Sequence, residues 1–342
     1  MKIAIIGAGP AGIEAAYTLA SHHIPVTLYE QNEQPLCHIT DKARLFPNFA
    51  NAQDIAERLR THAEHPLITH RYGTEVSQLL PSYIAGFHGE DLACSPIWKV
   101  NEELYDMVLL ATGYTPFDAH RKEELGYGIY PGVHTSLEME QMIGQGVIHN
   151  SLGERPKRVT FLQCVGSRDE KTGNHYCSKL CCVTAVKQAI EVKKMLPDAE
   201  VYIFYMDLRM WGQHFEELYR TAQQDYGVVF VRGRISEAGG TFDGRVQIKA
   251  EDTLMGLPLR MTTDLLVLMV GMEPSAGTRR LGGQCKICGD YGFAQSIDPH
   301  LDDCRTAARN LFVAGSCKRP MTLTDAIADG RSAAYEIVNS DR

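Results

Sequence analysis

The stretch KIAIIGAGPAG, residues 2–12, decides the fold of this chain. Its first half is an apolar run typical of a buried β-strand. Its second half is a glycine turn of the form GxGxxG, and an apolar helix pattern follows over residues 13–21. In such a turn Gly7 permits the tight bend, Gly9 lets the backbone approach a pyrophosphate, and Gly12 lets helix and strand pack closely. The order of these elements predicts a βαβ unit with a phosphate-binding turn.

The residues around this turn fit a dinucleotide. Pro10 and Ala11 open the helix, whose free N–H groups would face the phosphates. A second strand pattern over residues 25–30 ends in Glu30, which is placed to accept hydrogen bonds from the adenosine ribose. A GxGxxG turn alone can also be a glycine-rich loop without a ligand. Strand, turn, helix, strand and terminal acid in this order predict a dinucleotide-binding site.

Three further apolar runs, over residues 105–113, 264–271 and 310–315, each end in glycine. They resemble the strands at which the chain of a thioredoxin-reductase-like flavoprotein leaves its FAD domain, returns to it and completes the FAD site with a last helix. The resemblance spans the whole chain and implies FAD as the nucleotide. The further cofactor-binding residues that it implies are Ala111, Thr112, Gly113, Gly315, Ser316 and Asp325.

The sequence does not decide two features of the FAD site, namely the contact with the ribityl chain and the role of Lys42. Those flavoproteins usually have Gly-Asp at the end of the last strand, with the aspartate on the ribityl chain, whereas this sequence has Gly315-Ser316-Cys317. Lys42 falls where the chain should pass the flavin ring. Two interpretations are therefore open: Lys42 acts beside the flavin, or it is an ordinary solvated lysine.

The chain of 342 residues is long enough for about two domains. We predict an α/β fold of two Rossmann-like domains of the thioredoxin-reductase-like flavoprotein type. The FAD domain would comprise residues 1–118 and 282–342, interrupted by a second Rossmann-like domain over residues 119–281 that carries an iron–sulfur site.

The second domain has no recognisable phosphate loop. Its first strand, over residues 158–163, runs into Cys164-Val165-Gly166-Ser167 where a pyridine-nucleotide reductase would have another glycine motif. Direct NAD(P)H binding is therefore not expected there. Four cysteines with the spacing C-x12-C-x3-C-C stand in place of the loop, ahead of a helix pattern over residues 183–195.

These four cysteines can converge on one point. Cys177 and Cys181 would share a face of a helical turn, Cys182 is adjacent, and Cys164 leaves the end of a parallel strand, where open sheets bind ligands. Such a set suits a [4Fe–4S] cluster or an all-cysteine zinc site. Structural zinc sites more often use two CxxC pairs. A third interpretation is that the four residues are buried cysteines that bind no metal. A redox cluster beside a flavin is the favoured hypothesis.

Several consecutive motifs resemble the A subunit of heterodisulfide reductase. They are FLQCVGSRDE at 161–170, the cysteine segment 176–182, IFYMDLR at 203–209 and FEELY at 215–219. The resemblance implies that the four cysteines bind a [4Fe–4S] cluster close to FAD. It also implies a homodimeric electron-transfer subunit whose partners are B-like and C-like iron–sulfur subunits.

The sequence lacks the ferredoxin-like segments of methanogen A subunits. It therefore resembles the short A subunit of the heterodisulfide-reductase-like complex of sulfur-oxidising bacteria. The flavin subunit of a quinone-interacting complex of sulfate reducers is an alternative. A second alternative is a stand-alone NAD(P)H-dependent disulfide reductase that would use Cys285 and Cys288. A third alternative is a zinc-stabilised structural subunit. The isolated cysteines, for which core or surface positions are expected, are Cys37, Cys94, Cys304 and Cys317.

The composition of the chain limits the classes of binding partner and the cellular compartment that we expect. A net charge of −8 disfavours nucleic acid and anionic membranes, which are themselves negative. No apolar run approaches the roughly 20 residues of a membrane helix, and the chain enters its first strand at once, without a signal peptide. We expect a cytoplasmic protein without direct membrane insertion.

Overall fold

A computed structural model describes residues 1–82 and 97–340 of the chain. The chain divides into two compact units. Unit 1 comprises Met1–Ile39, Asp54–Thr115 and Glu273–Arg342, and unit 2 comprises Thr40–Gln53 and Pro116–Met272. Cys94 lies outside the described residues.

This division differs from the predicted domains in one segment. Thr40–Gln53 groups with unit 2, whereas the sequence placed these residues in the FAD domain. The reason is a set of long-range hydrogen bonds. The Ala43 N–H donates to Glu140 Oε1 at 3.1 Å, and Lys187 Nζ donates to the Arg44 carbonyl at 2.9 Å. The other two borders, at Thr115/Pro116 and Met272/Glu273, lie three and nine residues before the predicted ones.

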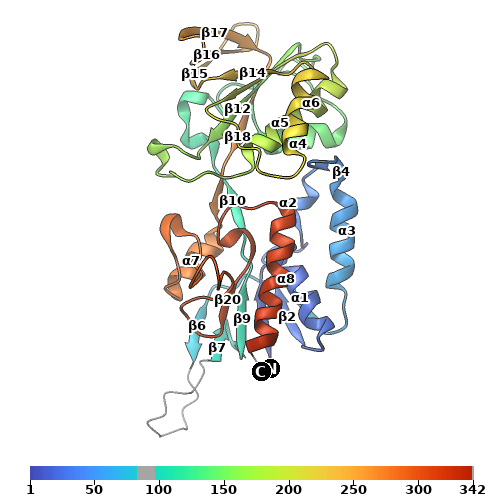
Figure 1. Cartoon of the computed structure of the whole chain (residues 1–342), viewed down its shortest axis with the longest axis vertical. Helices are drawn as coiled ribbons and strands as arrows, with labels where there is room; N and C mark the ends of the chain where they lie inside the picture. Colours follow the sequence, from blue (N-terminus) through green and yellow to red (C-terminus); the bar gives the residue numbers. More distant parts are fainter. Residues whose placement is uncertain (83–96, 341–342) are drawn as a thin grey trace, which may run out of the picture. The chain divides into compact units, whose positions relative to one another are not determined.

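Unit 1 is built on a five-stranded parallel sheet with the order β20-β9-β1-β2-β5 (Figure 1). Helices α1 and α8 pack closely against each other, because a Cβ at Gly330 of α8 would lie 2.1 Å from the Ala11 carbonyl oxygen of α1. A small antiparallel sheet, β6-β7-β8, and α7 pack through apolar side chains on the parallel strands. The strands are β1 (Ile3–Ile6), β2 (Val26–Tyr29), β5 (Ile68–Arg71), β6 (Leu79–Ser82), β7 (Ile97–Val100), β8 (Glu103–Tyr105), β9 (Met107–Leu110) and β20 (Leu311–Val313). The helices are α1 (Pro10–Ser21), α2 (Cys37–Thr40), α3 (Ala52–Ala63), α7 (Ala276–Gln284), α8 (Leu323–Ser340) and the 3-10 turns η4 (Asp290–Gly292) and η5 (Gly315–Cys317).

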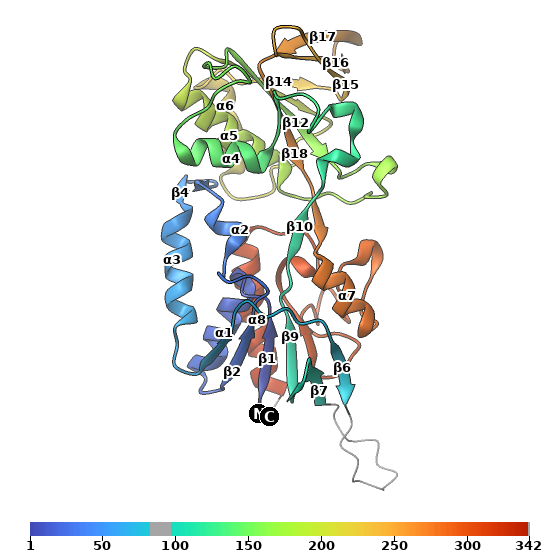
Figure 2. The same cartoon turned by 180° about the vertical axis from the view of Figure 1, so that it is seen from behind.

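Unit 2 contains a second five-stranded parallel sheet, with the order β11-β18-β12-β13-β14 (Figure 2). Alternate residues of its central strands point to two cores. Phe161 of β12 lies in the core with α4, α5 and α6, and Leu162 lies in the core with the antiparallel sheet β15-β16-β17. The strands are β3 (Arg44–Leu45), β4 (Ala50–Asn51), β11 (Val133–Thr135), β12 (Arg158–Val165), β13 (Glu200–Tyr205), β14 (Val229–Arg232), β15 (Ile235–Gly240), β16 (Val246–Asp252), β17 (Leu257–Thr263) and β18 (Leu265–Val270). The helices are α4 (Ser136–Gln145), α5 (Cys181–Met195), α6 (Phe215–Gln224) and the 3-10 turns η1 (Ala119–Arg121), η2 (Glu123–Leu125) and η3 (Glu170–Thr172).

The chain passes from unit 1 to unit 2 in β10 (Tyr114–Pro116) and returns in β19 (Met272–Pro274). These two passages follow strands that lead into a glycine, as the sequence predicted: Gly113 follows β9, and Gly271 follows β18. The segment Thr40–Gln53 makes a further excursion into unit 2. Of the helices in residues 1–82 and 97–340, none is long and apolar enough to cross a bilayer.

Candidate cofactor sites

The glycine turn at the end of β1 has the geometry that the sequence predicted. Gly7 has φ +112°, and its N–H donates to the Tyr29 carbonyl at 2.8 Å. A Cβ at Gly12 would lie 1.9 Å from the Gly7 carbonyl oxygen, so α1 can approach the turn only with glycine at this position. Gly9 is the N-cap of α1, Pro10 follows as its first residue, and the Ile13 N–H donates to Gly9 at 3.0 Å.

The acid at the end of β2 supports this turn directly. Glu30 Oε2 accepts the Ala8 N–H at 2.9 Å, and its Oε1 accepts the backbone N–H of Asn32 at 3.0 Å. The carboxylate therefore fixes the turn, and its remaining lone pairs are available to ribose hydroxyls.

The open side of the turn fits a pyrophosphate. A Cβ placed at Gly9 would meet no atom within 4 Å, in contrast to Gly7 and Gly12, whose Cβ positions collide with backbone. Gly9 therefore faces empty space at the start of a 12-residue helix, where N–H groups attract anions. Nearby, a cavity of about 60 Å³ is lined by Gly7, Glu30 and Arg280. The buried Nε of Arg280 has no hydrogen-bond partner among the described residues.

The ends of β9 and β20 lie next to each other in the same sheet. Beyond β9, Thr112 Oγ1 shares a hydrogen bond of 2.7 Å with Thr278 Oγ1, and the Thr112 carbonyl accepts Ser275 Oγ–H at 2.8 Å. Ala111 is buried and Gly113 has φ +68°. Beyond β20, Gly315 has φ +77° and its N–H donates to Asp329 Oδ2 at 2.6 Å.

A buried lysine completes this second turn. Lys318 Nζ donates to Asp329 Oδ1 at 2.8 Å and to Asp303 Oδ2 at 2.9 Å, and its side chain is 2% exposed. Neither Lys318 nor Asp329 was among the residues predicted from the sequence. Asp329 places a carboxylate beside Gly315, next to Ser316, where the resemblance to thioredoxin-reductase-like flavoproteins implied an aspartate.

Asp325 caps the N-terminus of α8 together with Thr322. Its N–H donates to Thr322 Oγ1 at 3.0 Å, and its Oδ2 accepts the Thr322 N–H at 3.2 Å, which is the reciprocal pattern of a capping box. A contact of Asp325 with a cofactor stays a prediction. Cys317 is fully buried and donates to the Leu110 carbonyl at 3.3 Å.

Lys42 belongs to unit 2. It lines a cavity of about 470 Å³ together with Glu140 and Gln141. Burial lowers the pKa of its ammonium group, and the neighbouring Glu140 opposes this shift. A role of Lys42 beside the flavin stays a prediction.

The cysteine segment of unit 2 begins at a distortion of β12. The register of β12 on β18 shifts between Leu162 and Val165, and Cys164 has φ +62°. Such bulges turn side chains away from the regular alternation and are frequent at functional sites. Cys181 and Cys182 open α5, as its first two residues.

One expectation about this segment is wrong. The sequence placed Cys177 and Cys181 on one face of a helical turn, but Cys177 precedes α5 in irregular backbone. The cause is Lys179, whose φ of +63° is incompatible with a right-handed helix. Cys177 reaches the other thiols from a loop, and its Sγ accepts the Lys179 N–H at 3.3 Å.

The four thiols still lie close enough to interact. Burial, together with the nearby Cys182 and Cys177 thiols, raises the pKa of Cys164 to about 12. Burial also raises the pKa of Cys181 well above its usual value, and the three other thiols of the set add to this shift. Deprotonation of these buried thiols therefore needs a positive partner such as a metal centre.

Four cysteine sulfurs are a donor set that either a zinc ion or a [4Fe–4S] cluster can use. Among the described residues, no group of three or more His, Cys, Asp or Glu side chains is arranged to hold one ion. Tetrahedral zinc draws four sulfurs to about 2.3 Å from one centre. A [4Fe–4S] cluster binds each thiolate at a different iron atom, so its ligands stand farther apart.

Backbone and cationic groups surround the thiols. The Arg209 N–H donates to Cys182 Sγ at 3.4 Å, and Arg168, which contributes to the pKa of Cys164, forms an ion pair with Asp207. The N-terminus of α5 adds partial positive charge at Cys181. These groups would offset the negative charge of thiolates bound to a cluster.

A cavity of about 710 Å³ lies beside Cys164 in unit 2. Its charged groups are paired, with Lys122 Nζ at 2.7 Å from Asp169 Oδ2 and Lys171 Nζ at 3.2 Å from Glu124 Oε1. The cavity therefore offers no unpaired cationic cluster to replace the missing phosphate loop.

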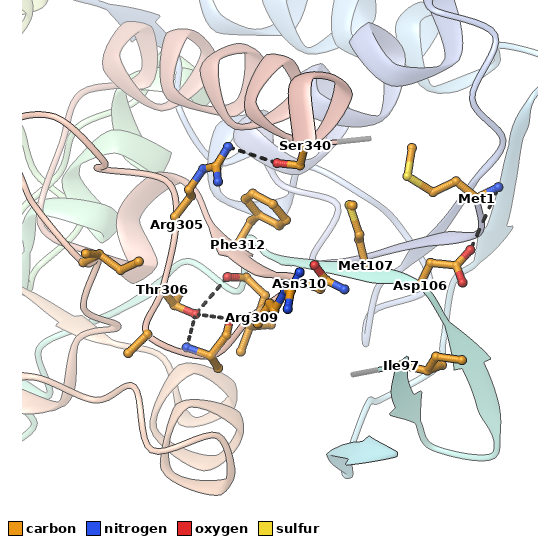
Figure 3. A pocket seen from close by; sticks show the side chains of 14 residues that line it. Met1, Ile97, Asp106, Met107, Arg305, Thr306, Arg309, Asn310, Phe312 and Ser340 are labelled. Atoms are coloured by element: carbon orange, nitrogen blue, oxygen red, sulfur yellow. Dashed lines mark hydrogen bonds and ion pairs between the residues drawn. The ribbon is translucent and has the colours of Figure 1, made fainter. Parts of the chain in front are cut away.

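Another cavity, of about 680 Å³, lies in unit 1 at the amino ends of the parallel strands (Figure 3). Met1 precedes β1, Met107 begins β9 and Asn310 precedes β20. Arg305 donates to Ser340 Oγ at 3.1 Å across it. Because open sheets bind ligands at the carboxyl ends of their strands, this cavity is not the nucleotide site.

The CxxC pair of unit 1 follows α7. Cys285 is half-buried and is the C-cap of this helix, while Cys288 is exposed, and both are free thiols. Burial raises the pKa of Cys285 to about 12, which disfavours the reactive thiolate.

Known proteins resemble the chain in sequence. The family model described as pyridine nucleotide-disulphide oxidoreductase matches residues 1–142, and this family implies FAD. The A subunit of the H(2)/formate:CoB-CoM heterodisulfide,ferredoxin reductase of Methanococcus maripaludis is 43% identical over 240 residues, covering 67% of this chain and 36% of that relative. The iron-sulfur A subunit of the CoB–CoM heterodisulfide reductase of Methanocaldococcus jannaschii is 40% identical, with the same coverage. The chain thus spans little more than a third of the length of these relatives.

Solved structures resemble it in fold. The thioredoxin reductase of Lactococcus lactis superposes with a TM-score of 0.68 at 18% identity, covering 99% of this chain and 98% of that one. The thioredoxin reductase of T. acidophilum gives a TM-score of 0.66, also at 18% identity and with the same coverage. These likenesses confirm the predicted α/β fold of the thioredoxin-reductase-like flavoprotein type. Over the region that it shares with the two methanogen relatives, the chain belongs to the family of heterodisulfide reductase A subunits, which are subunits of oxidoreductases.

Proposed function

We propose that the chain is a FAD- and [4Fe–4S]-containing electron-transfer subunit of a heterodisulfide-reductase-like complex. Unit 1 would hold FAD through the turn at Gly7–Gly12, Glu30 and the turn at Gly315. Unit 2 would hold the cluster through Cys164, Cys177, Cys181 and Cys182. When bound, these groups supply exchange of one or two electrons at the flavin and of single electrons at the cluster.

The residues of the chain would position the cofactors and set their electrostatics. The α1 N-terminus and the bare backbone at Gly9 would bind the pyrophosphate, and Glu30 would orient the ribose. The Arg209 N–H would stabilise the Cys182 thiolate as a ligand. In this proposal no side chain forms a bond to a substrate, and the isolated chain has little activity on small molecules.

The observation that carries the proposal is the convergence of the four cysteines in unit 2, where a pyridine-nucleotide reductase would bind its nucleotide. The place of this chain in sulfur oxidation, its homodimeric state and its B-like and C-like partners belong to the same proposal. They rest on the resemblance to the short A subunits. The quinone-interacting flavin subunit has no observation of its own in its favour.

The stand-alone NAD(P)H-dependent disulfide reductase is disfavoured by two features of the chain. The loop after β12 lacks the second glycine motif, and burial disfavours the thiolate of Cys285. Anaerobic addition of NADH or NADPH should leave the flavin absorbance of the isolated protein unchanged. Rapid bleaching would favour the reductase instead.

We expect Cys164→Ala and Cys181→Ala to remove the iron and acid-labile sulfide from the anaerobically purified protein, while FAD stays bound. The matched control is the double variant Cys285→Ser and Cys288→Ser, which changes two other cysteines and should keep both cofactors. The measurement is iron, sulfide and FAD content per chain. Full iron content in Cys164→Ala would contradict the ligand assignment.

A further inference from the structure

Gln163 is a buried amide with an unusual set of contacts. It precedes Cys164 in β12 and its side chain is 5% exposed. Its Oε1 accepts a hydrogen bond from the Cys182 thiol at 3.0 Å. Its Nε2 is buried and has no hydrogen-bond partner among residues 1–82 and 97–340. Buried amide nitrogens are nearly always paired, so this orphan needs an explanation.

The contact with Cys182 depends on the protonation of the thiol. A thiol can donate to the amide oxygen, but a thiolate has no proton and would face that oxygen unfavourably. The nitrogen and oxygen of a glutamine amide are exchanged by a half-turn of the terminal torsion, which needs no movement of the backbone. After this rotation the NH₂ group would face the sulfur of Cys182 and donate to it.

We propose that Gln163 donates an N–H···S hydrogen bond to the Cys182 thiolate when the cluster is bound, and thereby raises the reduction potential of the cluster. This inference rests on the proposed function. Together with the Arg209 N–H, the amide would give Cys182 two donors. Hydrogen bonds to cluster sulfurs are one of the factors that set these potentials, because a donor stabilises the more negative, reduced form.

The geometry of β12 supports a dedicated role for this side chain. The register shift between Leu162 and Val165 and the positive φ of Cys164 place Gln163 at the distortion from which the first cluster ligand leaves the strand. Gln163 would act through Cys182, so it is a positioning residue and not a catalytic one.

The test compares the cluster potential of three proteins purified without oxygen. They are the wild type, Gln163→Met, which keeps the volume and removes the amide, and Thr160→Val as control. Thr160 is a buried residue of the same strand, and its Oγ1 donates a hydrogen bond to Thr263 Oγ1 at 3.0 Å. Potentials are measured by redox titration followed by electron paramagnetic resonance, with iron and sulfide content measured beside them.

We expect Gln163→Met to keep its iron and sulfide, and to shift the redox equilibrium about three- to tenfold toward the oxidised cluster. A tenfold shift equals about 59 mV for one electron. Thr160→Val should titrate as the wild type does. An unchanged potential in Gln163→Met, or an equal shift in the control, would overturn the inference. A wild type without iron or sulfide would instead refute the proposed function.

A second measurement decides the case in which Gln163→Met fails to assemble a cluster. Wild-type protein carrying ¹⁵N only in its glutamine side chains is reduced and studied by pulsed electron paramagnetic resonance. A ¹⁵N coupling to the cluster spin supports the hydrogen bond from Gln163. Its absence would overturn it.

Discussion

Replacing Lys187 with methionine is expected to lower the free energy of unfolding by about 3–5 kcal/mol. Lys187 lies in α5 and its side chain is 2% exposed. Its Nζ donates to Glu140 Oε1 at 2.5 Å and lies 3.2 Å from Glu191 Oε2, and both of these carboxylates are buried. Neither oxygen of Glu191 has a hydrogen-bond partner among the described residues, so its ion pair with Lys187 balances its charge. Lys187 also forms the ion pair of Glu140, which has Lys42 as a second cationic neighbour. Methionine would fill the volume and leave both acids without this ion pair.

Lys194→Met is the matched control, because Lys194 lies in the same helix and is exposed. Its Nζ lies 4.1 Å from the centre of the Phe49 ring, so a loss of about 0.5–1 kcal/mol is expected. Adding Glu140→Gln to Lys187→Met should restore part of the stability, since it removes one unpaired charge. Urea unfolding of the purified proteins measures these differences. A Lys187→Met protein within about 1 kcal/mol of the wild type would contradict this account of the buried network.

Alanine substitution is expected to have different effects at two glycines of the same turn, Gly9 and Gly12. Gly9→Ala should weaken FAD binding at least about 100-fold, or about 2.8 kcal/mol, and leave the stability of the apoprotein nearly unchanged. Its Cβ meets no protein atom within 4 Å, and the backbone, with φ −79° and ψ −177°, suits alanine. The new methyl group would occupy the space into which the pyrophosphate fits.

Gly12→Ala should lose both FAD and stability. Its Cβ would lie 1.9 Å from the Gly7 carbonyl oxygen, so α1 must move away from the turn, at a cost of about 1–3 kcal/mol. Titration with FAD and urea unfolding of the apoproteins test both variants. Wild-type FAD affinity in Gly9→Ala would show that the phosphates do not bind at this turn.

The sequence predicted the features that follow from a regular local pattern of apolar and glycine residues. The βαβ unit at residues 2–30 is encoded by a local alternation of apolar and glycine residues, and the structure forms it within a residue or two at most boundaries. The strands ending at Gly113 and Gly271 follow the same rule.

Features that depend on distant residues were not predictable in this way. Asp329 meets Gly315 only because α8 folds back over the end of β20, and Lys318 joins Asp303 to the same cluster. Thr40–Gln53 groups with unit 2 through contacts with α4 and α5, which no local pattern encodes. The error at Cys177 came from Lys179, because periodicity cannot foresee a single residue with positive φ.

In the function proposed above, one chain carries FAD in unit 1 and a four-cysteine cluster in unit 2. The most direct test is anaerobic purification, followed by a visible spectrum and by iron, acid-labile sulfide and zinc analysis per flavin. We expect about four iron and four sulfide per FAD, with no stoichiometric zinc. FAD without iron and sulfide, or one zinc per chain in their place, would contradict this proposal.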